Sequence, residues 1–193
     1  MSIHRYFETY VFAVSDFISG ARCDEMIARA EQTGFDEATI NTPHGAVRAT
    51  DVRNNDRVIA DDPALAAELW ALAAPHVPSP FNNRKAVGLN ERFRFYRYDV
   101  GQLFDWHQDG AFERDNGEMS QLTFMIYLND GCDGGGTSFH DERGVLFEDF
   151  TVTPSKGTAL FFYHPIVHRG DAILAGRKYV LRSDVMYSAR LRS

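Results

Sequence analysis

The chain has 193 residues, of which 44% are hydrophobic and 13% aromatic, so we expect one domain spanning residues 1–193 around a sizeable core. A formal net charge of −7 gives no overall positive field for phosphate backbones, which disfavours nucleic acid as a partner. Two cysteines are too few for a disulfide framework, and no stretch approaches the ~20 apolar residues of a membrane span. We therefore expect a cytoplasmic protein without a membrane partner.

The first part of the chain, residues 1–87, is expected to form a helical support for the rest. A short strand-like run covers residues 10–14, and a helix is expected from about residue 19 to 33, closed by Gly34. The arginine-rich segment 44–57 is polar and lacks a clear period. It is either an edge hairpin or an exposed loop, and we favour a loop beside the functional site.

A second helix has stronger signals at both of its ends. Asp62 can cap it, Pro63 suits its first turn, and Pro75 stops it. Its expected apolar stripe consists of Leu65, Leu69, Trp70 and Leu72. Both helices are expected to brace a sheet.

From residue 88 to 187 the pattern changes to short strands about ten residues apart, separated by Gly, Pro, Asp and Asn. Such spacing favours an antiparallel barrel or a double-sheet roll over βαβ units. We therefore expect a mainly β fold with supporting α, in which a jelly-roll core carries the N-terminal helices packed against it. The expected strands are 90–98, 120–128, 137–141, 147–153, 157–164 and 178–187.

The sequence DWHQDG, residues 105–110, contains a candidate metal-binding pair. In an extended strand, side chains two residues apart point to the same face, so His107 and Asp109 can converge on one ion. Two histidines and one carboxylate define the non-haem Fe(II) oxygenase site, so a second histidine is needed. Without it, the pair is equally typical of a surface turn.

The candidate for the second histidine is His168, which follows a strongly apolar strand about sixty residues after the pair. Two other histidines compete for this role. His164 closes that strand and is expected in the core or beside the metal ligands. For His140 we favour a solvent-facing or strand-packing position.

A lysine at position 178, ten residues after His168, strengthens the interpretation. A buried lysine in a small roll needs an anionic partner, and the distal carboxylate of 2-oxoglutarate is such a partner. Arg182 has the same side-chain parity as Lys178 and can compete for that role or hold the substrate. The alternative for Lys178 is an exposed lysine on a strand.

Residues 88–187 resemble the Fe(II)- and 2-oxoglutarate-dependent dioxygenases, closest to the catalytic domains of prolyl 4-hydroxylases. The motifs that carry the resemblance are YDVGQLFDWHQD, TFMIYLNDGCDGGGTSF, PSKGTALFFYHPIVH and the interval from His168 to Lys178. They occur in the order of that family. One departure is the pair Asp105 and Trp106 before His107, where the family often has Glu-Pro, so substrate specificity is not carried over.

The resemblance implies the double-stranded β-helix fold, a cupin-like jelly roll, in residues 88–187. It also implies that His107, Asp109 and His168 are the iron ligands and hence the catalytic residues. The implied cofactors are Fe(II), 2-oxoglutarate and O2, with ascorbate as an open option.

The same resemblance implies how 2-oxoglutarate is bound. Lys178 would pair with its C5 carboxylate, and Tyr98 would add a hydroxyl hydrogen bond. Thr137 or Thr123 are further candidates, although packing is the favoured role of a strand threonine. Arg182 completes the set of candidate cofactor-binding residues.

The expected function is hydroxylation of an aliphatic C–H bond of a peptidyl or free amino-acid substrate, with release of succinate and CO2. Hydroxylation of another small metabolite is one alternative. A non-catalytic jelly-roll module that retains a metal is the other. The intact metal-binding set and Lys178 favour an enzyme.

Two features stay open from sequence alone. Residues 110–121 carry charges of both signs and two glycines, which suits either a mobile lid over the substrate or an ordinary solvated loop. Arg94, Tyr96 and Tyr98 share strand parity. If Tyr98 faces the barrel, Arg94 lines the mouth of the pocket, and otherwise it is an exposed arginine at a strand end.

Overall fold

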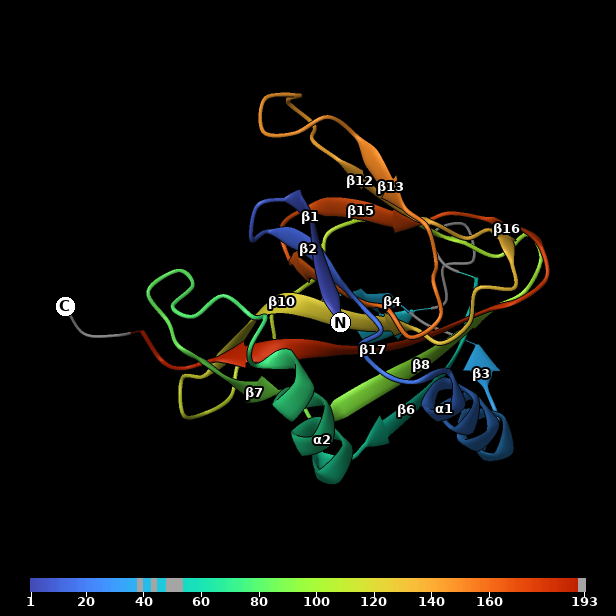
Figure 1. Ribbon diagram of the computed structural model, residues 1–193, viewed down its shortest axis with the longest axis horizontal. Helices are drawn as coiled ribbons and strands as arrows, with labels where there is room; N and C mark the ends of the chain where they lie inside the picture. Colours follow the sequence, from blue (N-terminus) through green and yellow to red (C-terminus); the bar gives the residue numbers. More distant parts are fainter. Residues whose placement is uncertain (38–39, 43–44, 48–53, 191–193) are drawn as a thin grey trace.

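The computed structural model describes residues 1–37, 40–42, 45–47 and 54–190. In these residues, antiparallel strands form two facing sheets, and two helices lie below the larger sheet (Figure 1). The helices are α1 (Gly20–Thr33) and α2 (Pro63–Ala73). Neither is long and apolar enough to span a membrane, as is true of every helix in the part of the chain described.

The larger sheet has the strand order β1-β2-β14-β10-β17-β8-β6-β3, and β7 pairs with β17 off this path. Its strands are β1 (Ser2–Phe7), β2 (Val11–Ser15), β14 (Ala159–Tyr163), β10 (Met119–Tyr127), β17 (Lys178–Tyr187), β8 (Arg92–Tyr98), β6 (Asp56–Asp61), β3 (Asp36–Glu37) and β7 (Ala86–Leu89).

The smaller sheet has the order β13-β12-β15-β9. Its strands are β13 (Phe150–Val152), β12 (Thr137–His140), β15 (Val167–Gly170) and β9 (Phe104–His107). Two further pairs are β11 (Asp133–Gly134) with β16 (Ile173–Ala175) and β4 (Ile40–Thr42) with β5 (Gly45–Val47).

From β8 to β17 the chain passes back and forth between the two facing sheets. This alternation is the jelly-roll arrangement and confirms the expected double-stranded β-helix core. All six strands expected in residues 88–187 are present, although the one at 147–153 is shortened to β13.

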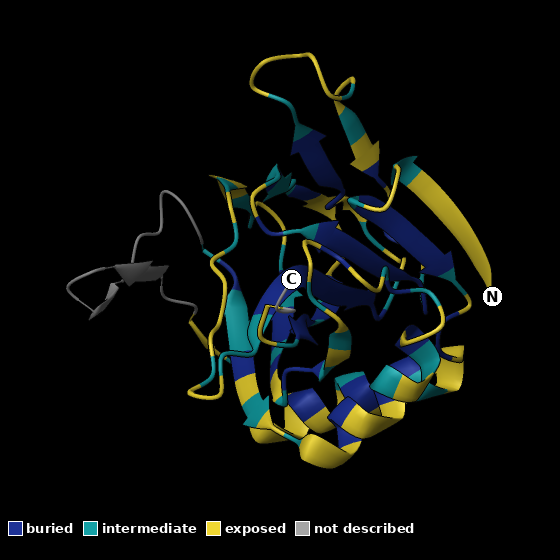
Figure 2. Ribbon diagram, turned by 90° about the vertical axis from the view of Figure 1, so that its left-hand side faces the viewer, coloured by how far each residue is buried: buried dark blue, intermediate teal, exposed yellow. Residues whose placement is uncertain are grey.

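Strand alternation divides the core into two apolar clusters. Figure 2 shows buried strands above two helices whose outer faces are exposed. On β10, Leu122, Phe124 and Ile126 belong to the apolar cluster that also contains the buried helix residues. Met125 and Tyr127 belong to the second cluster, inside the roll. The positions that face into the roll are therefore the ones available to build a site.

Both helices begin as expected. The Ser19 side chain accepts a hydrogen bond from the backbone N–H of Arg22 in α1, and Asp62 accepts one from Leu65 in α2. The expected stripe of α2 is only partly right, because Trp70 and Leu72 are half-buried at its margin. The fully buried face consists of Leu65, Ala66, Leu69 and Ala73. Its small alanines let the helix lie close to the sheet.

The N-terminal part of the chain is more than a helical support. Its strands β1, β2 and β6 join the larger sheet, with β2 paired to β14 and β6 paired to β8. The strand β1 is mostly exposed, so it carries no alternating apolar signal. These pairings across the two parts support the prediction of a single domain.

Where the structure describes the segment 44–57, the expected loop holds only for residues 54–55. Residues 45–47 form β5 and residues 56–57 begin β6, so the hairpin alternative holds for 45–47, while positions 44 and 48–53 lie outside the described residues. The segment 110–121 forms a short hairpin after Asp109. In it, the Arg114 backbone N–H donates to the Glu118 carbonyl at 2.8 Å. Its role as a lid stays a prediction.

The packing of α2 makes a direct test of this fold. Leu69→Ala should lower the free energy of unfolding by about 2–5 kcal/mol, because Leu69 is fully buried between helix and sheet. Leu146→Ala, at a leucine that is 67% exposed, is the matched control and should change it by less than about 0.5 kcal/mol. Urea unfolding followed by circular dichroism measures both, and equal losses would contradict the described packing.

Candidate metal centre and its pocket

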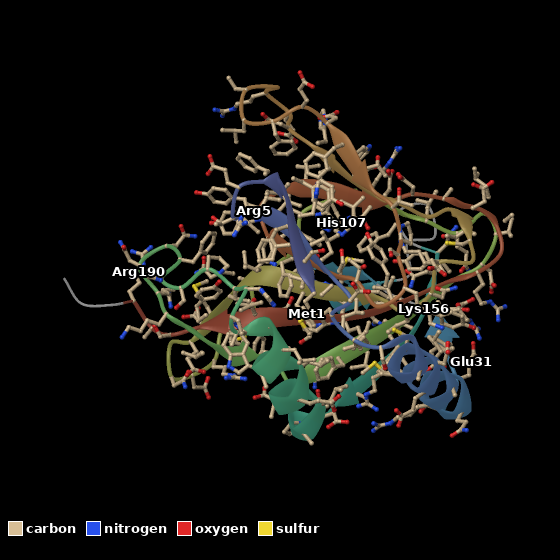
Figure 3. All side chains as sticks on the ribbon, in the orientation of Figure 1. Met1, Arg5, Glu31, His107, Lys156 and Arg190 are labelled. Atoms are coloured by element: carbon tan, nitrogen blue, oxygen red, sulfur yellow. The ribbon has the colours of Figure 1, made fainter. Side chains whose placement is uncertain are left out.

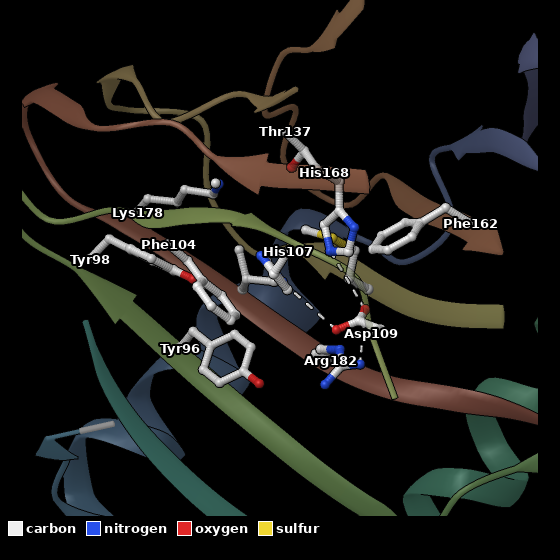
Figure 4. Close-up of a pocket in the computed structure, with 13 residues that line it drawn as sticks. Tyr96, Tyr98, Phe104, His107, Asp109, Thr137, Phe162, His168, Lys178 and Arg182 are labelled. Carbon is white, nitrogen blue, oxygen red and sulfur yellow. Dashed lines mark ion pairs between the residues drawn. The ribbon is translucent and has the colours of Figure 1, made fainter. Parts of the chain in front are cut away.

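A pocket lies between the two sheets (Figure 4). In the view of Figure 3, His107 lies near the middle of the molecule, while Glu31 and Arg190 lie towards opposite ends. The pocket is lined by Tyr96, Tyr98, Phe104, His107, Asp109, Met125, Thr137, Phe162, His168, Gly170, Lys178, Val180 and Arg182. Of the eight candidate ligands of the metal or of 2-oxoglutarate, all but Thr123 are among them.

The two histidines are brought together by strand pairing. His107 on β9 and His168 on β15 are direct partners in the register, and their ring centroids are 4.2 Å apart. Nδ1 of His107 donates to the Asp105 carbonyl at 2.6 Å, and Nδ1 of His168 donates to the Ile166 carbonyl at 2.9 Å. Because each Nδ1 carries its proton, each Nε2 keeps a free lone pair that can bind a metal.

Asp109 supplies the carboxylate of the set. Its Oδ1 is 3.8 Å from Nε2 of His107, and its Oδ2 is 3.6 Å from Nε2 of His168. The expectation that it shares a strand face with His107 is wrong, since β9 ends at His107. Asp109 is instead positioned by its backbone N–H, which donates to the His164 carbonyl at 3.1 Å.

The protonation states of these three groups suit a metal. Burial, and then the neighbouring His168, lowers the pKa of His107 to about 4, and burial lowers the pKa of His168. Burial opposes the charge of Asp109, but Arg182 and the imidazoles outweigh it and hold the carboxyl pKa well below its usual range. Two neutral imidazoles and one carboxylate, with ligand atoms within 4.8 Å of one another, form a donor set that fits Fe(II).

A chain of hydrogen bonds orients the Asp109 carboxylate. Thr123 Oγ1 donates to Asp109 Oδ2 at 2.5 Å and accepts from Nδ1 of His164 at 3.1 Å. Nε2 of His164 accepts from the Ser120 hydroxyl at 3.0 Å. His164 therefore lies beside the candidate ligands, as expected. The sequence favours a packing role for Thr123, but in the structure its hydroxyl binds Asp109. The sequence signal for this polar role is strand alternation, which turns Thr123 of β10 into the roll.

The remaining candidate histidine, His140, faces solvent. Its imidazole forms a pair with the exposed Asp149 at 2.8 Å. It lines a surface depression rather than the pocket between the sheets. The solvent-facing position expected for it is confirmed.

Lys178 occupies the side of the pocket away from Arg182 (Figure 4). It is 3% exposed, and its ammonium donates to the Gly135 carbonyl at 2.5 Å. The ammonium also lies 5.4 Å from the ring centroids of both Tyr98 and Tyr127. Burial lowers the pKa of Lys178 to about 8. Among the described residues no carboxylate forms an ion pair with it, so an anionic ligand would supply the missing charge.

Two hydroxyl groups line the pocket with Lys178. Tyr98 is its direct partner in the pairing of β8 with β17. Thr137 Oγ1 forms a hydrogen bond of 2.7 Å with the Tyr127 hydroxyl. Both residues line the pocket with Lys178, and their binding of 2-oxoglutarate stays a prediction.

Arg182 lies at the other side, against the candidate metal ligands. Its Nη2 is 3.0 Å from Oδ2 of Asp109 and 3.3 Å from Oδ1 of Asp184. Burial opposes its charge, but these two carboxylates outweigh it and raise the pKa of Arg182. Its contact with Asp109 gives Arg182 a role in orienting that carboxylate, and its binding of co-substrate stays a prediction.

A jelly roll with two imidazoles and a carboxylate converging in a buried pocket has the site of the non-haem Fe(II) oxygenases. The model of the 2OG-Fe(II) oxygenase superfamily matches residues 93–183. Residues 93–183, just under half of the chain, are thus similar to this superfamily, whose description names Fe(II) and 2-oxoglutarate.

Curated relatives with sequence similarity are prolyl 4-hydroxylases. Prolyl 4-hydroxylase 13 of Arabidopsis thaliana is 29% identical over 111 residues, which cover 47% of this chain and 40% of the relative. Prolyl 4-hydroxylase 5 of the same plant is 22% identical over 193 residues, covering 85% of this chain and 64% of the relative. The chain thus spans about half the length of these relatives. The predicted resemblance to prolyl 4-hydroxylases is confirmed.

Solved structures show the same fold. A prolyl-4-hydroxylase from Pseudomonas putida matches with a TM-score of 0.64 and 17% identity, covering 95% of this chain and 93% of that one. A prolyl hydroxylase from Trichoplax adhaerens, in complex with a peptide fragment of the hypoxia inducible factor oxygen degradation domain, has a TM-score of 0.69 and 13% identity. The match covers 92% of this chain and 84% of the Trichoplax adhaerens chain.

The hydroxyl of Thr123 offers a test of the metal centre. Thr123→Val should weaken binding of Mn(II) about 10- to 100-fold, because Asp109 loses the donor that orients it. Thr123→Ser keeps the hydroxyl and should bind Mn(II) nearly as well as the native protein. Isothermal titration calorimetry gives the affinities, and equal binding by both variants would contradict this role.

Proposed function

We propose that this chain is an Fe(II)- and 2-oxoglutarate-dependent dioxygenase. It would hydroxylate an aliphatic C–H bond of a peptidyl or free amino-acid substrate and release succinate and CO2. The observation that carries the proposal is one pocket that contains His107, Asp109, His168 and the buried Lys178, which forms no ion pair with a described carboxylate. The prolyl 4-hydroxylase relatives support an amino-acid type of substrate.

Three side chains would hold the metal. Nε2 of His107, Nε2 of His168 and the carboxylate of Asp109 offer three ligand atoms that would hold Fe(II) in the pocket. Bound Fe(II) with 2-oxoglutarate supplies the activation of O2 that C–H hydroxylation needs. Thr123 and Arg182 keep the Asp109 carboxylate oriented and ionised.

The other end of the pocket would bind the distal carboxylate of 2-oxoglutarate. The Lys178 ammonium supplies the opposite charge, and the hydroxyls of Tyr98 and Thr137 are candidate hydrogen-bond donors. The apolar walls, which include Met125 and Phe162, exclude water around these polar groups. Exclusion of water strengthens the electrostatic interaction between an ammonium and a carboxylate.

The alternative substrate is a small metabolite other than an amino acid. A substrate screen decides between these two classes of substrate.

We also propose a reducing, cytoplasmic location for this protein. Cys23 and Cys132 are both free thiols, which supports this location.

The metal centre should give a spectroscopic signature. Addition of Fe(II) and 2-oxoglutarate without oxygen is expected to produce a visible metal-to-ligand charge-transfer band in the native protein. His107→Ala removes a ligand and should abolish the band, whereas His140→Ala, at the solvent-facing histidine, should retain it. Absence of the band from the native protein would overturn the proposed function.

Turnover identifies the substrate class. Peptides and free amino acids are incubated with the protein, Fe(II), 2-oxoglutarate and O2, and succinate release is measured with product mass. A true substrate should stimulate succinate release and gain one oxygen atom. If only other metabolites do so, the alternative substrate class is correct.

The depressed pKa of Lys178 predicts how 2-oxoglutarate binding depends on pH. The free protein loses this proton near pH 8, while a bound carboxylate would favour the ammonium, so binding above about pH 8 takes up a proton. The apparent Kd of 2-oxoglutarate should therefore rise up to about tenfold per pH unit above pH 8 and should not change through this group below it.

A pair of lysine variants assigns this pH dependence. Lys178→Met should raise the Kd at pH 7 by about tenfold or more and remove the dependence above pH 8. Lys156→Arg, at a lysine paired with Asp24, should leave it unchanged. Calorimetric titration with Mn(II)-loaded protein provides the Kd values. A dependence that survives in Lys178→Met would exclude Lys178 as its source.

A further inference from the structure

A second cleft lies between β8 and the hairpin that follows Asp109. It is lined by Asp61, Asn90, Glu91, Arg92, Arg94, Phe112 and Arg114. None of these residues lines the metal pocket. The cleft is therefore a distinct feature that the proposed chemistry leaves unexplained.

This cleft is linked to the metal pocket by strand pairing and by a shared carboxylate. Arg94 on β8 is the direct partner of Arg182 on β17. Opposed residues of an antiparallel pair point to the same face, with Cα atoms about 4.5–5.5 Å apart. Asp184 lies between their guanidinium groups, 3.3 Å from Nη2 of Arg182 and 3.9 Å from Nη1 of Arg94. A group bound at Arg94 would thus lie beside the Arg182–Asp109 pair.

Two of the three arginines in the cleft are neutralised by close ion pairs. Arg92 binds Asp61 through two hydrogen bonds of 2.8 and 2.9 Å. Arg114 binds Glu118 at 2.7 Å and Glu91 at 2.5 Å. These two side chains already have acceptors for their charge.

Arg94 differs from them. Its guanidinium donates no hydrogen bond to a described residue, and its Nη1 is a buried nitrogen without a hydrogen-bond partner. Among the described residues it forms one ion pair, at 3.9 Å, with Asp184, which lies closer to Arg182. A guanidinium favours planar acceptors with two oxygen atoms. The guanidinium of Arg94, which lacks such an acceptor among the described residues, therefore suits a carboxylate.

We propose that the cleft is a substrate subsite in which Arg94 binds a carboxylate of the substrate. This proposal rests on the proposed function, because the reacting C–H bond of the substrate must lie at the metal in the adjacent pocket. The half-exposed ring of Phe112 gives an apolar wall for the part of the substrate between the two sites. A monoanion fits better than a phosphate dianion, because Asp61, Glu91 and Asp184 also surround the position.

The carboxylate has two sources, the free C-terminal group of an amino acid or peptide and an acidic side chain. The first source makes the enzyme act on free amino acids or on chain ends. The second makes it act on internal residues next to Asp or Glu. Both sources share the chemistry that Arg94 recognises.

The test compares matched ligands on protein loaded with Mn(II) and 2-oxoglutarate, which does not turn over. N-acetylated amino acids are titrated as free acids and as carboxamides, followed by ligand-detected NMR. The native protein should bind at least one acid about tenfold or more tightly than its amide. Arg94→Gln should remove that preference, while Arg92→Gln, in the same cleft but already paired with Asp61, should keep it.

A second set of probes identifies the source. Short peptides with amidated ends carry either Glu or Gln beside the residue that the first panel selects, or beside proline if it selects none. A preference for Glu that disappears in Arg94→Gln assigns the subsite to an acidic side chain. A preference confined to free acids assigns it to the C-terminal carboxylate. No acid preference in either set, or a preference that Arg94→Gln retains, would overturn the proposal.

Two controls separate this proposal from the function on which it rests. Arg94→Gln should keep the native melting temperature and the charge-transfer band with Fe(II) and 2-oxoglutarate, since Arg182 still pairs with Asp184. If the native protein shows the band but no carboxylate preference, the subsite is wrong and the function stands. If the native protein shows no band, the function is wrong, while an acid preference lost in Arg94→Gln would still establish a carboxylate site.

Discussion

The pairing of β9 with β15 is the constraint on which the candidate metal centre depends. It places His107 opposite His168, although sixty residues of chain separate them. It also holds the turn after β9 close enough for the Asp109 backbone to bind the His164 carbonyl. On the facing sheet, Tyr98 opposite Lys178 forms a second cross-strand pair. Two such pairs, one in each sheet, therefore position both ends of the pocket.

Charge is distributed unevenly over this pocket. At one end, Asp109 is balanced by Arg182 and stays ionised in a buried position. At the other end, Lys178 is buried without a carboxylate partner among the described residues, an arrangement that destabilises the free protein. A fold selected for stability alone would place an apolar side chain there. The unfavourable charge is thus better explained by binding than by folding.

Sequence patterns predict the C-terminal strands well, because their apolar runs and turn residues recur at regular spacing. The resemblance to the 2-oxoglutarate-dependent dioxygenases, which rests on the order and spacing of the motifs, predicts His107, Asp109, His168 and Lys178, and these four residues line one pocket. The exposed edge strand β1 has no such pattern. The sequence also has no pattern that places Asp109 beyond the end of β9. These features depend on contacts between distant segments that local periodicity does not encode. The same is true of the hydrogen bond from Thr123 and of the buried Nη1 of Arg94, which has no hydrogen-bond partner among the described residues.

The N-terminal strand β1 hydrogen-bonds within the larger sheet, yet its Tyr6 ring stacks on Phe150 of β13 in the smaller one, with centroids 5.2 Å apart. This stack is a spacer between the two sheets. Because protein interiors are close-packed, the Tyr6–Phe150 stack helps to fix the distance between the two sheets, and the pocket lies between them. Tyr6 and Phe150, which do not line the pocket, thereby influence its width.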